Sequence, residues 1–193
     1  MIEGVNLSLK RIKTDHLDLI QFHGAPSKEL LHEAIQALQD LKREGKVRFI
    51  GCSTVLPDVT ELLQLGVFDT FQMPYSSVER EHEAVITQIA KAGAGTIIRG
   101  GVGRGEPGYG LADPDRWKMW EAARLDELLG GMDKFEFMLR FTITHPDVST
   151  TIVGTLNPEH VTHNMAAFKK GPLPAATYAE AKKRLTVAGA VPV

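Results

Sequence analysis

Short apolar runs alternate with amphipathic helical stripes along almost the whole sequence. The run Leu17-Asp-Leu-Ile-Gln-Phe-His23 predicts a short core strand, and the leucine-rich stripe that follows it, up to Gly45, predicts a helix. The same pairing recurs at 49–52 with 57–65, at 70–76 with 84–93, at 95–101 with later helices, and at 148–155 with 158–168. Five strands that alternate with helices predict an α/β fold with a parallel sheet and right-handed crossovers.

This pattern fits two architectures, an open doubly wound sheet or part of a (β/α)8 barrel. A complete barrel has eight strands and typically about 250 residues, so the five units found in 193 residues do not make a complete one. Further helices are expected at 1–13, 117–129, 134–144 and 178–187, with a glycine-rich loop over 100–115. No Gly/Ser-rich linker divides the chain, so we expect residues 1–193 to form a single domain.

The composition argues against several functional classes. The net charge is -2, and no block of like charge suggests an arm for nucleic acid. The amino terminus lacks the pattern of a secretory signal, and no apolar run is long enough to span a bilayer. The single cysteine, Cys52, lies in an apolar run and fits a reducing compartment. We therefore expect a cytoplasmic protein that binds neither nucleic acid nor membranes.

His23 is the first candidate for a catalytic residue. It ends a predicted core strand, and ligands of parallel α/β folds bind at the carboxyl ends of the strands. The alternative is a histidine that is only hydrogen-bonded at a strand end. Among the seven histidines only His160 and His163 have a helical spacing of three, and no cysteine or carboxylate beyond Glu159 completes a ligand set, so no metal site is expected.

Four segments follow one another at the expected strand ends. They are Asp15-His-Leu-Asp-Leu-Ile-Gln-Phe-His23, Leu41-Lys-Arg-Glu-Gly-Lys-Val-Arg-Phe-Ile-Gly-Cys-Ser53, Phe71-Gln-Met-Pro-Tyr75 and Gly154-Thr-Leu-Asn-Pro-Glu-His-Val-Thr-His-Asn164. In this order and spacing they resemble the aldo-keto reductase family, over residues 2–173. The resemblance implies a (β/α)8 TIM barrel, represented here by about five βα units. It also implies NADP(H) as cofactor and hydride transfer to or from a small aldehyde or ketone.

The same resemblance implies roles for individual residues. His23 matches the histidine that orients the substrate carbonyl, where a ring N–H would stabilise negative charge on oxygen. The implied cofactor-binding residues are Ser53, Gln72, Arg99, Gly100, Gly101, Val102, Gly154, Thr155, Leu156, His160 and Asn164. Thr54 and His163 depart from the family pattern, which usually has asparagine and an acidic residue there, and Arg99 replaces a common aromatic residue.

The largest departure concerns the proton donor. The family's catalytic set also needs a tyrosine, a lysine and an aspartate on strands that precede the one ending at His23, and Tyr75, Tyr109 and Tyr178 lie elsewhere. We therefore expect the carboxyl-terminal part of an aldo-keto reductase with impaired catalysis, and possible self-association through exposed barrel edges. One alternative is a non-catalytic NADP(H)-binding or interaction module, as in potassium-channel β subunits. Another is an open-sheet α/β enzyme with His23 as its base.

Overall fold

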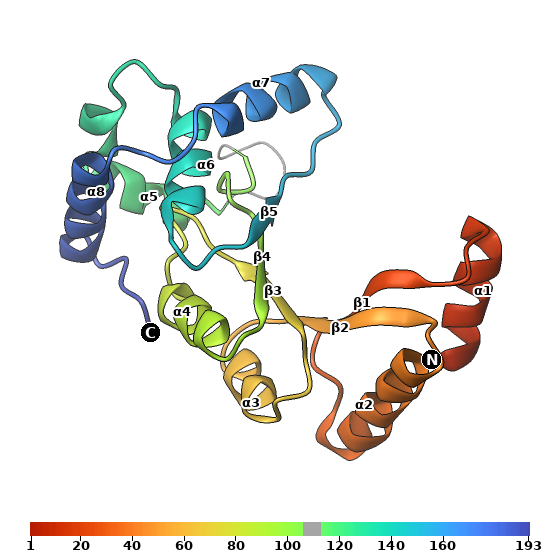
Figure 1. Cartoon of the computed structure of the whole chain (residues 1–193). Coiled ribbons are helices and arrows are strands. Elements are labelled where there is room, and N and C mark those ends of the chain that lie inside the picture. The colour runs from red at the N-terminus through yellow and green to blue at the C-terminus, as the bar shows by residue number, and fades with distance from the viewer. Residues whose placement is uncertain (106–112) are drawn as a thin grey trace. The chain divides into compact units, whose positions relative to one another are not determined.

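The computed structural model describes residues 1–105 and 113–193, which form a parallel α/β fold (Figure 1). The strands are β1 (Leu17–His23), β2 (Val47–Ser53), β3 (Thr70–Pro74), β4 (Gly95–Arg99) and β5 (Thr150–Ile152), in the order β1-β2-β3-β4-β5. The helices are α1 (Ile2–Ile12), α2 (Lys28–Arg43), α3 (Asp58–Gln64), α4 (Glu83–Lys91), α5 (Pro114–Ala122), α6 (Lys134–Thr144), α7 (Pro158–Lys169) and α8 (Ala175–Val187). The predicted alternation of parallel strands with helices is confirmed.

The chain divides into two compact units. The first unit contains residues 1–72 and 88–95, and the second unit contains residues 73–87 and 96–193. The expected single domain over 1–193 stays a prediction. None of the helices within residues 1–105 and 113–193 combines the length and apolar character needed to cross a membrane.

In the first unit, β1 and β2 pair in parallel along their whole length, from Leu17 opposite Val47 to His23 opposite Ser53. The start of β3 continues this pairing. Helix α2 packs against β2 with Leu38 and Leu41 buried (Figure 1). Side chains alternate between the two faces of a strand, so one face of these strands carries the apolar residues that pack under the helices.

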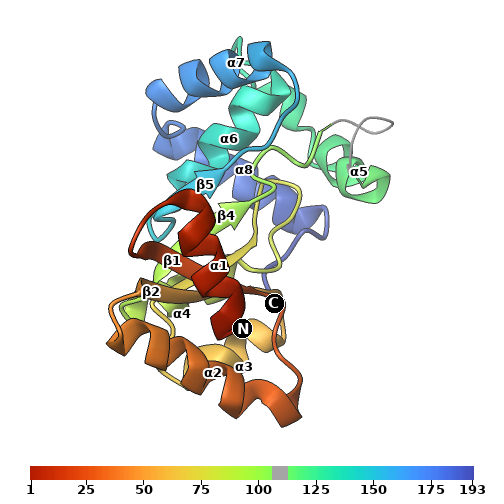
Figure 2. The same cartoon turned by 90° about the vertical axis from the view of Figure 1, so that its right-hand side faces the viewer.

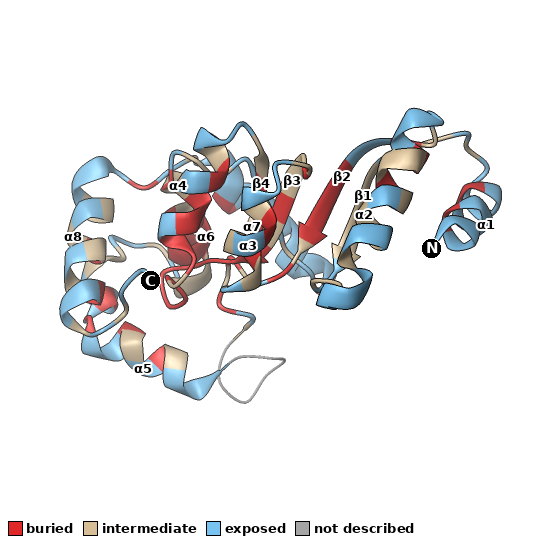
Figure 3. Ribbon diagram, turned by 90° about the horizontal axis from the view of Figure 1, so that it is seen from below, coloured by how far each residue is buried: buried red, intermediate tan, exposed pale blue. Residues whose placement is uncertain are grey.

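In the second unit, β4 pairs with β5 in parallel, from Ile97 opposite Thr150 to Arg99 opposite Ile152. Helices α6 and α7 lie against each other (Figure 2). Several residues of α6, among them Phe137, Met138 and Phe141, are fully buried (Figure 3). The helix predicted at 134–144 is confirmed with the same bounds.

The structure corrects the helix expected at 117–129. Helix α5 ends at Ala122, and a 3-10 helix, η1 (Leu125–Leu128), follows after a break at Arg124. Arg124 has a left-handed φ of 51°, which cannot continue an α-helix, and its carbonyl oxygen accepts a hydrogen bond from Arg184 of α8 at 3.1 Å. The tertiary contact therefore overrides a continuous helical pattern.

Three strands are also shorter than predicted, and the first of them, expected at 70–76, ends at Pro74. The strand expected at 95–101 ends at Arg99, because Gly100 adopts a φ of 71° that turns the chain out of the sheet. The strand expected at 148–155 is reduced to Thr150–Ile152. The residues predicted from these two strand ends, Gly100 and Gly154, therefore lie in loops.

Candidate active site

Three of the predicted site residues lie side by side in the first unit. His23 is the register partner of Ser53, and Ser53 is the register partner of Gln72, so the three residues form one row across β1, β2 and β3. Register partners in a parallel sheet direct their side chains to the same face. An imidazole, a hydroxyl and an amide thus stand together at the carboxyl ends of neighbouring strands, which is where parallel α/β proteins bind their ligands.

Two of these three side chains have no hydrogen-bond partner among the described residues. Within those ranges, neither the His23 ring nor the Ser53 hydroxyl makes a hydrogen bond to another side chain or to the backbone, and the His23 residue is exposed. The role of His23 stays a prediction. An imidazole and a hydroxyl that are free to bind fit a ligand with polar groups, such as a carbonyl or a carboxamide.

Gln72 has a partner that the sequence analysis missed. The Gln21 Nε2 donates a hydrogen bond to the Gln72 Oε1 at 3.0 Å, across the intervening β2. The sequence could have pointed to Gln21, because it precedes His23 by two residues in the same strand and therefore lies on the same strand face. Thr54, the departure from the family pattern, donates its backbone N–H to the Gln72 carbonyl at 3.0 Å and is buried.

Arg99 and the glycines after it belong to the second unit. Gly100 and Gly103 have positive φ values of 71° and 66°, and the Gly103 N–H donates to the Gly100 carbonyl at 2.9 Å, which closes a tight turn around Gly101 and Val102. A Cβ at Gly101 would lie 2.9 Å from the Thr151 Oγ1, so only glycine permits this close packing. Residues 106–112 of the predicted loop, which include Tyr109, lie outside the described residues, and the end of the predicted loop at 114–115 belongs to α5.

Arg99 is a cation without a carboxylate at ion-pair distance. In the part of the chain that the structure describes, it makes no salt bridge, whereas the nearby Glu79 pairs with Arg116 at 3.2 Å and with Arg104 at 3.5 Å. Burial lowers the pKa of Arg99, and the neighbouring charge of Arg104 lowers it further. The charge of Glu79 acts in the opposite direction, and a half-buried guanidinium without a salt bridge among the described residues, beside a glycine turn, fits an anionic group such as a phosphate.

Other predicted residues lie together at the amino terminus of α7. Asn157 caps the helix by accepting from the Glu159 N–H at 2.9 Å, and Thr155 Oγ1 accepts from the Asn157 N–H at 3.1 Å. The same Thr155 hydroxyl lies 3.1 Å from the His160 Nδ1, and Leu156 is fully exposed. Gly154 leads into this capped helix start, which is a favourable position for an anion.

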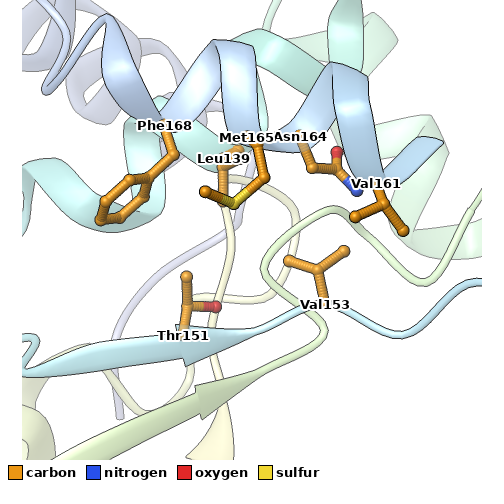
Figure 4. A pocket seen from close by; sticks show the side chains of 7 residues that line it. All are labelled: Leu139, Thr151, Val153, Val161, Asn164, Met165 and Phe168. Atoms are coloured by element: carbon orange, nitrogen blue, oxygen red, sulfur yellow. The ribbon is translucent and has the colours of Figure 1, made fainter. Parts of the chain in front are cut away.

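Asn164 and His163 lie on α7 with different surroundings. Asn164 lines a pocket of about 180 Å³ between α7, α6 and β5 (Figure 4). The other lining residues are Leu139, Thr151, Val153, Val161, Met165 and Phe168. The His163 Nε2 lies 2.9 Å from the Asp133 Oδ2, so its side chain already has a partner within the protein.

The two tyrosines that the structure describes are not suited to donate a proton. The Tyr75 and Tyr178 hydroxyl oxygens lie 3.2 Å apart in the second unit, and the Tyr75 hydroxyl lies 3.5 Å from the Glu83 Oε2. Burial raises the pKa of Tyr178 to about 12 and that of Tyr75 well above its ordinary value. No group of three or more His, Cys, Asp or Glu side chains in residues 1–105 and 113–193 is placed to hold a metal ion.

A row of polar side chains at the ends of parallel strands, with a glycine turn and a capped helix farther along the chain, places this protein in the class of parallel α/β proteins that bind ligands at their strand ends. The model of the aldo/keto reductase family matches residues 1–185. The chain therefore belongs to the aldo-keto reductase family, as its sequence motifs predict.

Individual relatives agree with this assignment. The chain is 26% identical to the uncharacterized oxidoreductase YqkF of Bacillus subtilis, over 86% of this chain and 59% of that protein. It is 27% identical to the NADH-specific methylglyoxal reductase of Escherichia coli, over 86% of this chain and 58% of that protein. The structure of the aldo-keto reductase AKR11C1 from Bacillus halodurans in its holo form superposes with a TM-score of 0.81 at 28% identity, covering 95% of this chain and 63% of that one.

The chain matches only a part of each of these relatives. The chain spans about three fifths of the length of the relatives it matches, and its five parallel strands correspond to part of their (β/α)8 barrel. The barrel architecture of this chain is thus a partial one, as the sequence predicts.

Proposed function

We propose that this chain carries the cofactor-binding and carbonyl-orienting part of an NADP(H)-dependent oxidoreductase that acts on a small aldehyde or ketone, or on the corresponding alcohol. The observation that carries the proposal is the row of His23, Ser53 and Gln72 at neighbouring strand ends. A nicotinamide cofactor, when bound, supplies or accepts the hydride. Membership of the aldo-keto reductase family supports the reaction class.

Each member of this row has a proposed task that follows from its chemistry. The His23 ring donates an N–H to the substrate oxygen and stabilises the negative charge that develops there. The Ser53 hydroxyl and the Gln72 amide bind the carboxamide of the nicotinamide, since both combine a donor with an acceptor. Arg99 and the turn from Gly100 to Val102 hold the pyrophosphate, and Gly154, Thr155, Leu156, His160 and Asn164 bind the adenosine end.

The choice between NADPH and NADH is part of the proposal. Family resemblance supports NADP(H), while one relative is by name an NADH-specific reductase. Residues 153–168 contain no lysine or arginine, and His163 is paired with Asp133, so His160 is the basic side chain left for a 2′-phosphate in this segment. Both nucleotides therefore belong in the first binding experiment.

That experiment is a fluorescence titration of the purified chain with NADPH and with NADH. We expect micromolar binding to at least one nucleotide and a loss of at least tenfold in Arg99→Ala. The surface variant Arg48→Ala serves as a control, because Arg48 pairs only with the exposed Asp18. No binding of either nucleotide by the wild-type chain would contradict the proposal.

The proposal includes impaired catalysis by the 193-residue chain. Tyr75 is buried and Tyr178 half-buried, both with raised pKa values, and no tyrosine, lysine and aspartate set accompanies His23 among the described residues. We expect carbonyl-dependent oxidation of NADPH to be absent or slower by several orders of magnitude than in full-length relatives. Robust turnover would contradict this part of the proposal.

The second candidate function is a non-catalytic NADP(H)-binding or interaction module. It is favoured because the described residues place no tyrosine, lysine and aspartate set beside His23. Nucleotide binding without turnover, in this chain and in any longer form, would support it. We also propose a cytoplasmic location, because the lone Cys52 is a buried free thiol. We further propose that the chain self-associates through the outer edges of β1 and β5, since both strands lie at the ends of the strand order. Light scattering, which measures the mass of the particle in solution, tests this proposal.

A further inference from the structure

Gln21 lies directly beneath the row of His23, Ser53 and Gln72. Its register partner is Gly51, whose own partner on β3 is Thr70, so these three residues form a second row on the same face of the strands. All of them belong to the first unit. Gln21 is therefore built into the strand that carries His23, but one layer deeper.

The contact between Gln21 and Gln72 depends on the glycine between them. A Cβ at Gly51 would lie 3.2 Å from the Gln21 Cγ and 2.2 Å from the Thr70 Oγ1. Without that Cβ, the Gln21 side chain reaches across β2 and its Nε2 donates to the Gln72 Oε1 at 3.0 Å. The hydrogen bond thus spans two strand spacings, which is possible at this position because no side chain stands on β2.

We propose that Gln21 is a positioning residue that holds the Gln72 side-chain amide in place for the cofactor; this inference rests on the proposed function. The hydrogen bond occupies the Gln72 Oε1 and leaves the Gln72 Nε2 available to a ligand. Its matching partner is a carbonyl oxygen, such as that of the nicotinamide carboxamide.

The remaining atoms of Gln21 argue against a purely structural role. The Gln21 Oε1 and the Thr70 Oγ1 are buried without a hydrogen-bond partner among the described residues. A buried acceptor without a partner destabilises the folded state, and such groups in a native structure call for a functional explanation. Replacement of Gln21 by an apolar residue of similar length is therefore expected to leave stability unchanged or to raise it, while it releases Gln72.

The test combines a spectroscopic and a binding readout on the 193-residue chain. In 15N-labelled protein, the Gln72 side-chain amide signal is assigned through its loss in Gln72→Leu, and its 15N{1H} NOE is compared between the wild type and Gln21→Met. We expect a clearly lower NOE, which means a more mobile side-chain amide, in Gln21→Met, and about tenfold weaker nucleotide binding with an unfolding midpoint no lower than that of the wild type. The control is Gln36→Met, which removes an exposed hydrogen bond to Asp40 on α2 and is expected to change neither readout.

The outcomes separate this inference from the function on which it rests. A wild-type chain that binds neither NADPH nor NADH would overturn the proposed function. An unchanged NOE of the Gln72 side-chain amide in Gln21→Met would overturn the inference, whichever way the wild-type titration turns out. Weaker binding together with a lowered unfolding midpoint would also overturn it, because Gln21 would then act through stability.

Discussion

Glu79 and Glu83 lie four residues apart in the second unit, are 4% and 6% exposed, and have carboxyl pKa values shifted in opposite directions. Burial raises the pKa of Glu79, and the partly exposed Arg116 and Arg104 do not offset this effect. Burial also acts to raise the pKa of Glu83, but hydrogen bonds from Arg80 and Lys182 outweigh it and leave the pKa lowered. The difference arises because the partner of Glu83 is itself buried.

We expect Glu83→Gln to destabilise the protein by about 3 kcal/mol, since removal of one partner leaves a buried charge uncompensated. The Arg80 Nε lies 2.7 Å from the Glu83 Oε2, and its Nη1 also donates to the Lys182 and Ala190 carbonyls, which ties this pair to α8. Urea unfolding followed by circular dichroism measures the change. The matched control is Glu180→Gln. The Glu180 carboxylate lies 2.9 Å from the Arg184 Nε on the surface, so its replacement should have a much smaller effect on stability. Equal effects of the two changes would contradict the prediction.

The two carboxyl groups should also give opposite pH dependence. The lowered pKa of Glu83 means that its stabilisation is fully present above its ordinary value of 4.5 and is lost as the pH falls through the folded-state value. The raised pKa of Glu79 means that the folded state holds this proton more tightly, so stability is lost as the pH rises above 4.5. Unfolding free energies measured between pH 4 and 7 should therefore fall less steeply with rising pH in Glu79→Gln than in the wild type. Superimposable pH profiles would refute the assignment to Glu79.

Gly51→Ala should destabilise the first unit by about 1–3 kcal/mol through overpacking. The new Cβ would lie 2.8 Å from the Thr70 backbone oxygen, which cannot move without disturbing the pairing of β2 with β3. Thermal unfolding tests this. The control is Gly4→Ala in α1, where nothing lies within 4 Å of the added Cβ and where alanine is expected to stabilise the helix by about 0.5–1 kcal/mol. A Gly51→Ala variant with the stability of the wild type would show that β2 and β3 can move apart without destabilising the fold.

Cys52 should be unreactive in the folded protein at pH 8. Burial, with a smaller effect of the Asp58 charge, raises the pKa of its thiol to about 11, so almost no thiolate is present. We expect slow reaction with a disulfide reagent such as DTNB in buffer and fast, stoichiometric reaction in denaturant. Rapid labelling of the folded chain would mean that β2 opens readily.

Sequence periodicity was sufficient to predict most of the fold. The helix at 134–144 and the strand ending at His23 have the predicted bounds, because a strongly apolar run with a capping residue leaves few alternatives. The candidate residues His23, Ser53 and Gln72 were predicted from strand ends and family motifs, and the structure brings them into one row. Their roles stay predictions.

The sequence by itself thus determined the parallel α/β fold and the family, because both depend on local periodicity and on the order of motifs. Only the tertiary structure decided the bond between Gln21 and Gln72, the break at Arg124 and the opposite titration of Glu79 and Glu83. These features depend on the register between strands or on contacts with charged side chains from distant parts of the chain. Such pairings join residues far apart in the chain, and local propensity carries no information about them.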